Sequence, residues 1–139
     1  MRRAVLLPIA ALLAGCSGSP PGNLGVQNQK LAPCPDSPNC VSSFATDPEH
    51  KIAPLAANLD QIKMAVAQMD RAEVIQSTSD YLHVEFTSAI FRFIDDVEFL
   101  YDDETALSHV RSASRIGHSD LGVNRKRVET IRKLLDNGR

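Results

Sequence analysis

The sequence is short of several residue types, and each shortage argues against a class of protein. Its 139 residues include no tryptophan, and aromatic residues make up 5% of the chain. Nucleic-acid-binding surfaces combine an excess of positive charge with stacking aromatic side chains, whereas the formal net charge here is −2. The four histidines include no pair spaced four residues apart, so the helical zinc motif is missing. We therefore expect no nucleic-acid partner, no metal and no cofactor.

The sequence contains a single long apolar run, which lies at its start. Arg2 and Arg3 precede the run Ala4–Ala14, which Pro8 interrupts. A helix that spans a bilayer needs about 20 apolar residues, so this run is too short to span. A charged start followed by a short apolar run is typical of a signal peptide, which we predict over residues 1–15.

The apolar run ends in LAGC, residues 13–16, which resembles the lipobox of bacterial lipoproteins. In that motif, small residues give the signal peptidase access to the bond before the cysteine, and the cysteine thiol then carries diacylglycerol. We predict that Cys16 is acylated, with palmitate, and joins the protein to the lipid bilayer. Ser17 in place of aspartate resembles the sorting signal for the outer membrane, which places the protein in the bacterial cell envelope, facing the periplasm. The alternative is an ordinary secretory signal with a chance cysteine.

The three cysteines are an odd number, which fits an exported protein when one of them is modified. With Cys16 acylated, Cys34 and Cys40 remain, and an oxidising periplasm would join them in a disulfide. Prolines and short polar residues between them favour a bend. Two alternatives are a metal site completed by Asp47 and His50, and a redox pair, although a redox pair normally has the spacing C-x-x-C.

The rest of the chain divides by composition. Residues 17–30 are rich in Gly, Ser, Pro, Asn and Gln, which predicts a flexible tether with an r.m.s. span of about 20 Å. We expect the lipidated cysteine and tether to cover residues 16–30, and a single α+β domain to cover residues 31–139.

Charge is distributed unevenly within that domain. Residues 80–104 contain eight acidic residues and one base, a net charge of −7. Residues 111–139 contain eight bases and three acidic residues, a net charge of +5. Such asymmetry produces either internal ion pairs or two faces of opposite sign.

Two amphipathic segments predict helices. In residues 58–70, Asn58 and Gln61 form a capping-box pattern, and apolar residues follow at helical spacing. The second helix is expected near Asn124 to Asp136, and the stretch DNG is a fitting end for it.

Between the two helices the hydrophobic period changes to two, which predicts strands. The alternation is clear in YLHVEFT at Tyr81–Thr87, around Val97–Tyr101 and in Leu107–Ser114, and further strands are expected at Ile90–Ile94 and Glu73–Gln76. Short connections between strands indicate an antiparallel meander. The predicted fold is α+β, a small antiparallel sheet of three to five strands with two helices packed on one face, as a two-layer sandwich.

Three separated stretches carry a resemblance to a known family. They are the opening segment, SPNCVSS at residues 37–43 and FRFIDDVEF at residues 91–99. Together they resemble the family called domain of unknown function 1499, over most of Leu31 to Leu135. Its bacterial members include many small lipoproteins, so the resemblance implies a lipoprotein. It implies no established activity, substrate or catalytic residue.

The candidate site lies in RSASRIGHSDLGVNRKR, residues 111–127. A glycine-containing loop that runs into a helix N-terminus exposes free N–H groups and a partial positive charge. Arginine adds forked donors that suit phosphate or carboxylate. The predicted anion-binding corner consists of Arg111, Arg115, Arg125 and Arg127. Its expected ligands are lipid headgroups, peptidoglycan carboxylates or the acidic tail of a protein partner.

The same arginines allow a structural interpretation. Strand alternation places Arg111 and Arg115 on one side, where acidic residues of a neighbouring strand can pair with them in an ion-pair network. The candidate charge partners are Asp95, Asp96, Glu98 and Asp120, of which Asp120 can instead cap the helix. Charge clusters arise from binding sites and from structural networks, so the sequence leaves both interpretations open.

Catalysis is the less favoured class of function. Ser112, Ser114 or Ser119 could act as a nucleophile with His109 or His118 as base and Asp120 as its orienter. The sequence has no G-x-S-x-G elbow that would specify such a site. We therefore predict a membrane-anchored, periplasm-facing lipoprotein that is a binding or cell-envelope accessory module, with a hydrolase of envelope material as the alternative.

Overall fold

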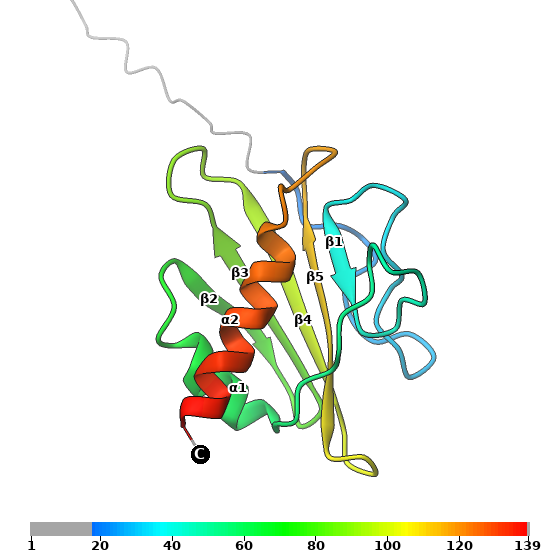
Figure 1. Ribbon diagram of the computed structural model, residues 1–139, viewed down its shortest axis with the longest axis vertical. Coiled ribbons are helices and arrows are strands. Elements are labelled where there is room, and N and C mark those ends of the chain that lie inside the picture. The colour runs from blue at the N-terminus through cyan, green and yellow to red at the C-terminus, as the bar shows by residue number, and fades with distance from the viewer. Residues whose placement is uncertain (1–17, 139) are drawn as a thin grey trace, which may run out of the picture.

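Five strands and two helices form the described part of the chain, residues 18–138 of a computed structural model (Figure 1). In chain order they are β1 (Cys40–Ser42), α1 (Leu59–Val66), β2 (Ala72–Ser77), β3 (Tyr81–Thr87), β4 (Ile94–Asp102), β5 (Leu107–Ser114) and α2 (Val123–Asn137). The predicted signal peptide and Cys16 lie outside the described residues. The strands form one antiparallel sheet in the order β1-β5-β4-β3-β2, which confirms the predicted α+β fold.

Strands β2 to β5 form the predicted meander, in which each strand pairs with the next one along the chain. The sequence pattern does not predict β1, which joins the free edge of β5 with Cys40 opposite Ala113. The disulfide-forming segment therefore lies beside the strand that carries Arg111.

The strand predicted at Ile90–Ile94 is wrong, because residues 90–93 form the turn between β3 and β4. Ser88 closes this turn, since its Oγ accepts the N–H of Phe93 at 2.8 Å and its own N–H donates to the Phe93 carbonyl at 2.8 Å. Arg92 has a φ of 58°, in the left-handed region that a strand does not accommodate. β4 then continues through the acidic pair Asp95–Asp96 without ending there.

The hydrophobic core lies on the face of the sheet that both helices cover (Figure 1). Alternate strand residues point to this face, and those buried in the core are Val41, Leu82, Val84, Phe86, Val97, Phe99 and Val110. The helices add Leu59, Ile62, Ala65 and Val66 from α1, and Val128 and Ile131 from α2. Within residues 18–138, neither helix combines the length and the apolar content that crossing a bilayer requires.

Both helix starts rest on polar caps. At α1 the predicted capping box is confirmed, since Asn58 Oδ1 accepts the Gln61 N–H at 3.0 Å and Gln61 Oε1 accepts the Asn58 N–H at 2.9 Å. At α2, Asp120 accepts the N–H groups of Gly122 at 2.8 Å and of Asn124 at 3.0 Å. Asp120 therefore satisfies donors that the first turn of a helix leaves free.

Strand β2 forms one edge of the sheet, and its pairing with β3 is irregular. Val74 pairs with Val84 and Gln76 pairs with His83, so Ile75 is an extra residue in a β-bulge. Val74 and Ile75 are both about half exposed.

The leading segment, residues 18–35, crosses the face of the sheet opposite the helices. The N–H of Gly25 donates to Glu98 Oε1 at 2.7 Å, and Leu31 is buried against Tyr81 and Leu100. The described residues of the predicted tether therefore contact the domain, and the flexibility of the tether stays a prediction.

Candidate functional site on the polar face of the sheet

Ionisable side chains line the sheet surface that faces away from the helices, which we call the polar face. They alternate along β3, β4 and β5 with the core residues, and they include Tyr81, His83, Glu85, Asp96, Glu98, Arg111 and Arg115, the last just beyond β5. The leading segment covers this face, so Glu98 is fully buried and Asp96 is 1% exposed. Buried charges need partners, and the partners decide what this face can do.

Arg115 pairs with two carboxylates. Its Nε and Nη2 donate to the two carboxylate oxygens of Asp96 at 2.8 Å each, and Nη2 also donates to Glu85. His83 Nε2 contacts Asp96 Oδ1 at 2.8 Å. Burial alone raises the pKa of Asp96, but the hydrogen bonds from Arg115 and His83 bring it below its usual value. Asp96 in turn raises the pKa of Arg115.

The trio His83, Glu85 and Asp96 also has a spacing that could hold a metal ion, with ligand atoms within 4.8 Å of one another. Arg115 donates to both carboxylates of this trio, so a guanidinium already supplies positive charge there. We therefore assign these three residues to an ion-pair network with Arg115.

Arg111 is less completely engaged. Its Nη1 donates to Glu98 Oε2 at 3.3 Å, a longer contact than those of Arg115, although its side chain is 5% exposed. The other oxygen of Glu98 accepts the Tyr81 hydroxyl at 2.8 Å and the Gly25 N–H. Burial raises the pKa of Tyr81, and the charge of Glu98 raises it further. Among the described residues, Arg111 Nε is buried and has no hydrogen-bond partner.

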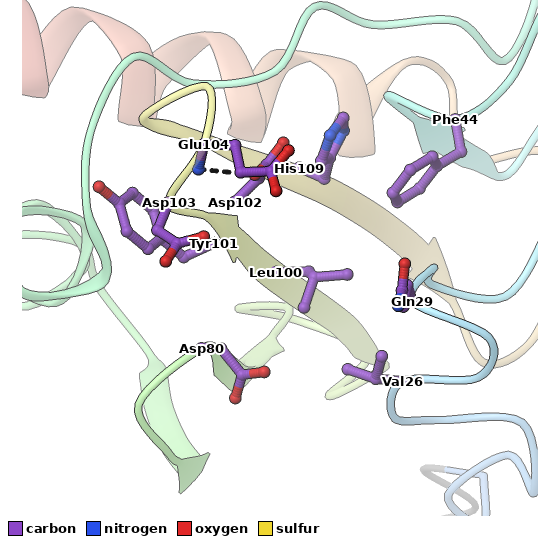
Figure 2. A pocket seen from close by; sticks show the side chains of 10 residues that line it. All are labelled: Val26, Gln29, Phe44, Asp80, Leu100, Tyr101, Asp102, Asp103, Glu104 and His109. Carbon is purple, nitrogen blue, oxygen red and sulfur yellow. Dashed lines mark hydrogen bonds between the residues drawn. The ribbon is translucent and has the colours of Figure 1, made fainter.

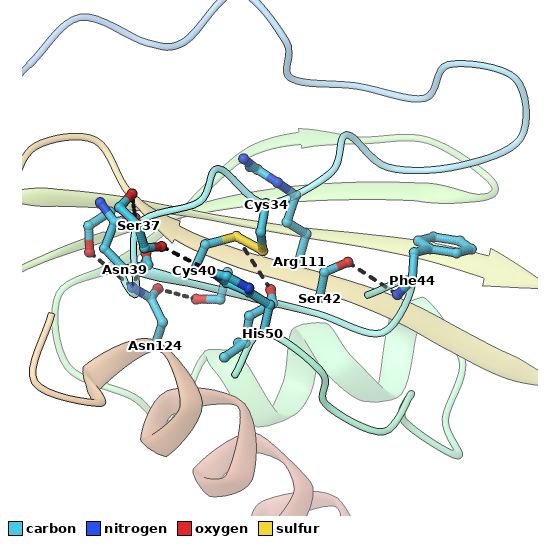
Figure 3. Close-up of a disulfide and its surroundings, with 12 residues drawn as sticks. Cys34, Ser37, Asn39, Cys40, Ser42, Phe44, His50, Arg111 and Asn124 are labelled. Carbon is cyan, nitrogen blue, oxygen red and sulfur yellow. Dashed lines mark hydrogen bonds between the residues drawn. A yellow bond between two sulfur atoms is a disulfide. The ribbon is translucent and has the colours of Figure 1, made fainter. Parts of the chain in front are cut away.

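A cavity of about 350 Å³ adjoins Arg111 between the polar face and the leading segment. Its lining residues are Pro21, Asn23, Pro33, Cys34, Pro35, Asp96, Arg111, Ala113, Ser114 and Arg115. Figure 3 shows Arg111 beside the Cys34–Cys40 disulfide, of which Cys34 lines this cavity.

The predicted disulfide between Cys34 and Cys40 is confirmed, with their Cα atoms 5.7 Å apart (Figure 3). The alternative metal site loses its thiolates because these sulfurs are bonded to each other. His50 instead spans two oxygen atoms, Asp47 Oδ1 at 2.8 Å from Nδ1 and the Ser37 carbonyl at 3.2 Å from Nε2.

The predicted anion-binding corner is not assembled, because the four arginines lie in different surroundings. Arg111 and Arg115 are on the polar face, whereas α2 carries Arg125 and Arg127 on the helix side of the sheet. Arg125 donates to backbone carbonyls of residues 49 and 51 at 2.8 Å each. Arg127 donates to Asp95 at 2.5 Å and lies 4.8 Å from the ring centroid of Phe86.

The predicted charge partners therefore separate. Asp96 and Glu98 meet Arg115 and Arg111, while Asp95 meets Arg127. The pleat explains the split, since Asp95 and Asp96 are consecutive on β4 and point to opposite faces.

Asn124 joins three parts of the fold, a role that the sequence pattern does not indicate. It is fully buried, and its Nδ2 donates to the Asn39 carbonyl at 3.1 Å, Ser114 Oγ at 2.9 Å and Asp120 at 2.8 Å. Its Oδ1 accepts the hydroxyl of Ser112 at 2.5 Å. A polar residue in the first turn of an otherwise apolar helix face was the one available signal.

The hydrolase arrangement is not supported by these positions. Ser112 and Ser114 face the helices and contact Asn124, whereas His109 lies on the opposite face of β5. Ser119 Oγ accepts the N–H of Leu121 at 3.3 Å.

His109 has different neighbours from those predicted. It contacts Ser43 Oγ through Nδ1 at 3.1 Å and stacks on Phe44 with ring centroids 4.2 Å apart. The same Oγ accepts the N–H of Val110 at 2.9 Å, so the serine is held in the backbone pairing of β5.

His109 and Phe44 form one wall of a second cavity, of about 400 Å³ (Figure 2). Its acidic lining residues are Asp80, Asp102, Asp103 and Glu104. Asp102 accepts hydrogen bonds from Thr105 Oγ1 and the Glu104 N–H, which lower its pKa. Asp102 therefore stabilises the turn, and the four carboxylates give this cavity an acidic lining.

Comparison with known proteins gives one match. No curated protein and no solved structure matches the chain. The family described as Protein of unknown function (DUF1499) matches residues 30–135, which is well over half of the chain and covers all five strands, α1 and all but the last two residues of α2. The chain therefore belongs to this family of proteins of unknown function.

Proposed function

We propose that this protein is a lipoprotein of the bacterial cell envelope, joined to the outer membrane through acylated Cys16 and facing the periplasm. Its domain is a binding or envelope-accessory module. The charged start, the short apolar run and the LAGC ending support the anchor. The Cys34–Cys40 disulfide supports an oxidising compartment, because cytosolic thiols are kept reduced.

Metabolic labelling with an alkyne analogue of palmitate tests the anchor. We expect the wild-type protein to take up the label and to sediment with membranes, and Cys16→Ser to lose both properties. The double variant Cys34→Ala/Cys40→Ala is the matched control and should keep the label. Label retained in Cys16→Ser would contradict the anchor.

Arg111 is the residue on which the binding role rests. Most ionisable groups of the polar face have short, well-placed partners, but Arg111 makes one long contact with Glu98 and leaves Nε unpaired. An unpaired buried donor costs about 1–3 kcal/mol, and a guanidinium offers five donors. An anionic oxygen in the adjoining cavity would complete this hydrogen bonding, so the ligand we propose carries a carboxylate or phosphate group.

Thermal unfolding with added inorganic phosphate or acetate tests this ligand class. We expect phosphate or acetate to raise the Tm of the wild-type protein beyond the effect of chloride at equal ionic strength, and to leave Arg111→Met unchanged. For each protein, the Tm with added anion is compared with the Tm of the same protein without it. This comparison is needed because Arg111→Met also removes the cation that faces Glu98 and so changes the starting Tm. Arg125→Met is the control, since Arg125 binds backbone carbonyls away from the cavity. Equal shifts in wild type and Arg111→Met would overturn the assignment of Arg111.

A further inference from the structure

Two loops lie together at one end of the sheet. The turn between β3 and β4 and the loop between β5 and α2 both leave the sheet there, because Thr87 pairs with Ile94 and Asp95 pairs with Ser114. The N–H of Arg115 also donates to the Ile94 carbonyl at 3.2 Å. Figure 1 shows both loops at the top of the molecule. We call residues 88–93 and 115–123 the loop end.

The loop end carries large apolar side chains that take no part in the core. Their exposed fractions are 82% for Ile90, 73% for Phe91, 41% for Phe93, 36% for Ile116, 94% for Leu121 and 47% for Val123. Phe91 and Phe93 stack with ring centroids 5.4 Å apart. Leu121 has a φ of 54°, a conformation that leucine rarely adopts, so the loop presents it to solvent at a cost. Exposed apolar groups gathered in this way mark a contact surface.

The chain enters the domain at this same end. Gly18 lies so close to the loop that a Cβ added to it would come within 3.1 Å of Ile116 Cγ2 and 3.2 Å of Arg115 Cβ. Only Ser17 separates Gly18 from Cys16 in the sequence. Two residues extend at most about 7 Å, so an acylated Cys16 would hold the bilayer next to the loop end.

The two ends of the sheet differ in charge. Arg71 and Arg92 are exposed at the loop end, where the Arg71 carbonyl accepts the N–H of Thr87 at 3.0 Å, and the acidic residues Asp70 and Asp120 balance their charge. The opposite end holds two acidic turns, one with Asp80 and the other with Asp103, and the Tyr101 N–H donates to the Asp80 carbonyl at 2.8 Å. An anionic membrane surface repels the acidic end and does not repel the loop end.

We propose that the loop end docks on the bilayer that holds Cys16, with Ile90, Phe91 and Leu121 inserted among the lipid headgroups. Apolar side chains flanked by basic residues bind such an interface. The inference rests on the proposed anchor, and it adds that the domain is held in one orientation, with its acidic end directed away from the membrane.

A single tryptophan reports on this contact, because the chain has none of its own. Full-length Phe91→Trp is reconstituted into vesicles of phosphatidylethanolamine and phosphatidylglycerol with brominated acyl chains. We expect its emission to shift to shorter wavelength and to be quenched. Asp103→Trp, on the acidic end, is the matched control and should keep the emission of a solvent-exposed tryptophan.

The outcomes separate the docking from the anchor. Palmitate label on Cys16 with unquenched Phe91→Trp overturns the docking and leaves the anchor, and the apolar loops would then suit a protein partner. Quenching of Phe91→Trp without any label on Cys16 overturns the anchor and supports the docking. Equal quenching of Phe91→Trp and Asp103→Trp overturns the single orientation.

Discussion

Arg115 and Asp96 form a two-point ion pair in which both oxygens of the carboxylate accept hydrogen bonds from one guanidinium, at 2.8 Å each. Both side chains are almost completely buried. The pair fastens the end of β5 to β4 on the polar face, since Asp96 lies on β4 and Arg115 follows the last residue of β5. Its geometry is that of a structural connection, because the donors of Arg115 that face Asp96 are already used.

Replacing Arg115 by methionine should lower the free energy of unfolding by about 3–5 kcal/mol, because Asp96 would remain buried without its cation. Urea denaturation followed by circular dichroism measures the loss. Lys126→Met is the control, since Lys126 is exposed on α2, and it should change stability by less than about 0.5 kcal/mol. A loss in Arg115→Met no larger than that of the control would show that the pair is not structural.

Replacing Asn124 by alanine should lower the free energy of unfolding by about 2–3 kcal/mol. The change removes an amide that pairs with the Asn39 carbonyl and Ser112 Oγ inside the protein, and a buried group that loses its partner costs about 1–3 kcal/mol. Thermal and urea unfolding should agree on the loss. Thr130→Ala is the control on the same helix. The hydroxyl of Thr130 donates to the Lys126 carbonyl at the solvent-exposed surface, so its loss should have a much smaller effect. Similar effects of the two changes would argue against Asn124 as a central connection.

Removing the disulfide should have a modest effect on stability. The bridge closes a short loop with a sequence separation of 6, for which chain entropy predicts about 2 kcal/mol. The double variant Cys34→Ala/Cys40→Ala should therefore stay folded with a lower Tm, and a reducing agent should lower the Tm of the wild type but not that of the variant. An unfolded double variant would contradict this modest effect and would show that the whole domain depends on the bridge.

His50 should make stability depend on pH. Burial alone lowers its pKa, but the Ser37 carbonyl and Asp47 favour the protonated ring, and the net shift is upward from 6.5. A raised folded-state pKa contributes stability that is fully present below the unfolded-state value of 6.5 and is lost as the pH rises through the folded-state value. The stability difference between wild type and His50→Gln should therefore be larger at about pH 5 than at about pH 8.5. A difference that stays constant with pH would rule out this contribution.

Strand alternation is enough to predict which arginines share a face, but not which acidic groups they meet. The pattern at residues 107–114 correctly places Arg111 and Arg115 together, opposite Ser112. Their partners depend on the register between β4 and β5, which the turn at residues 103–106 sets. The sequence pattern does not determine that register. An ion-pair network and an anion-binding corner therefore predict the same sequence pattern.

Other features depend on contacts between distant residues. Residues 90–93 are apolar enough to suggest a strand, but Ser88 and the left-handed Arg92 turn the chain there. The leading segment has the composition of a flexible tether, yet Gly25 pairs with Glu98 across 73 residues of sequence. β1 is three residues long, too short for any alternation to be detected.

The β-bulge at Ile75 makes the β2 edge of the sheet a poor template for pairing with another strand. An edge strand presents a row of free N–H and C=O groups to which a strand of another molecule can add, and β2 is such an edge with apolar residues exposed on it. The extra residue puts the two halves of β2 out of phase, so a straight incoming strand could match one half and not the other. At the other edge, β1 offers only three residues for pairing. The irregular edge and the short edge together oppose the growth of this open sheet into aggregates at high local concentration.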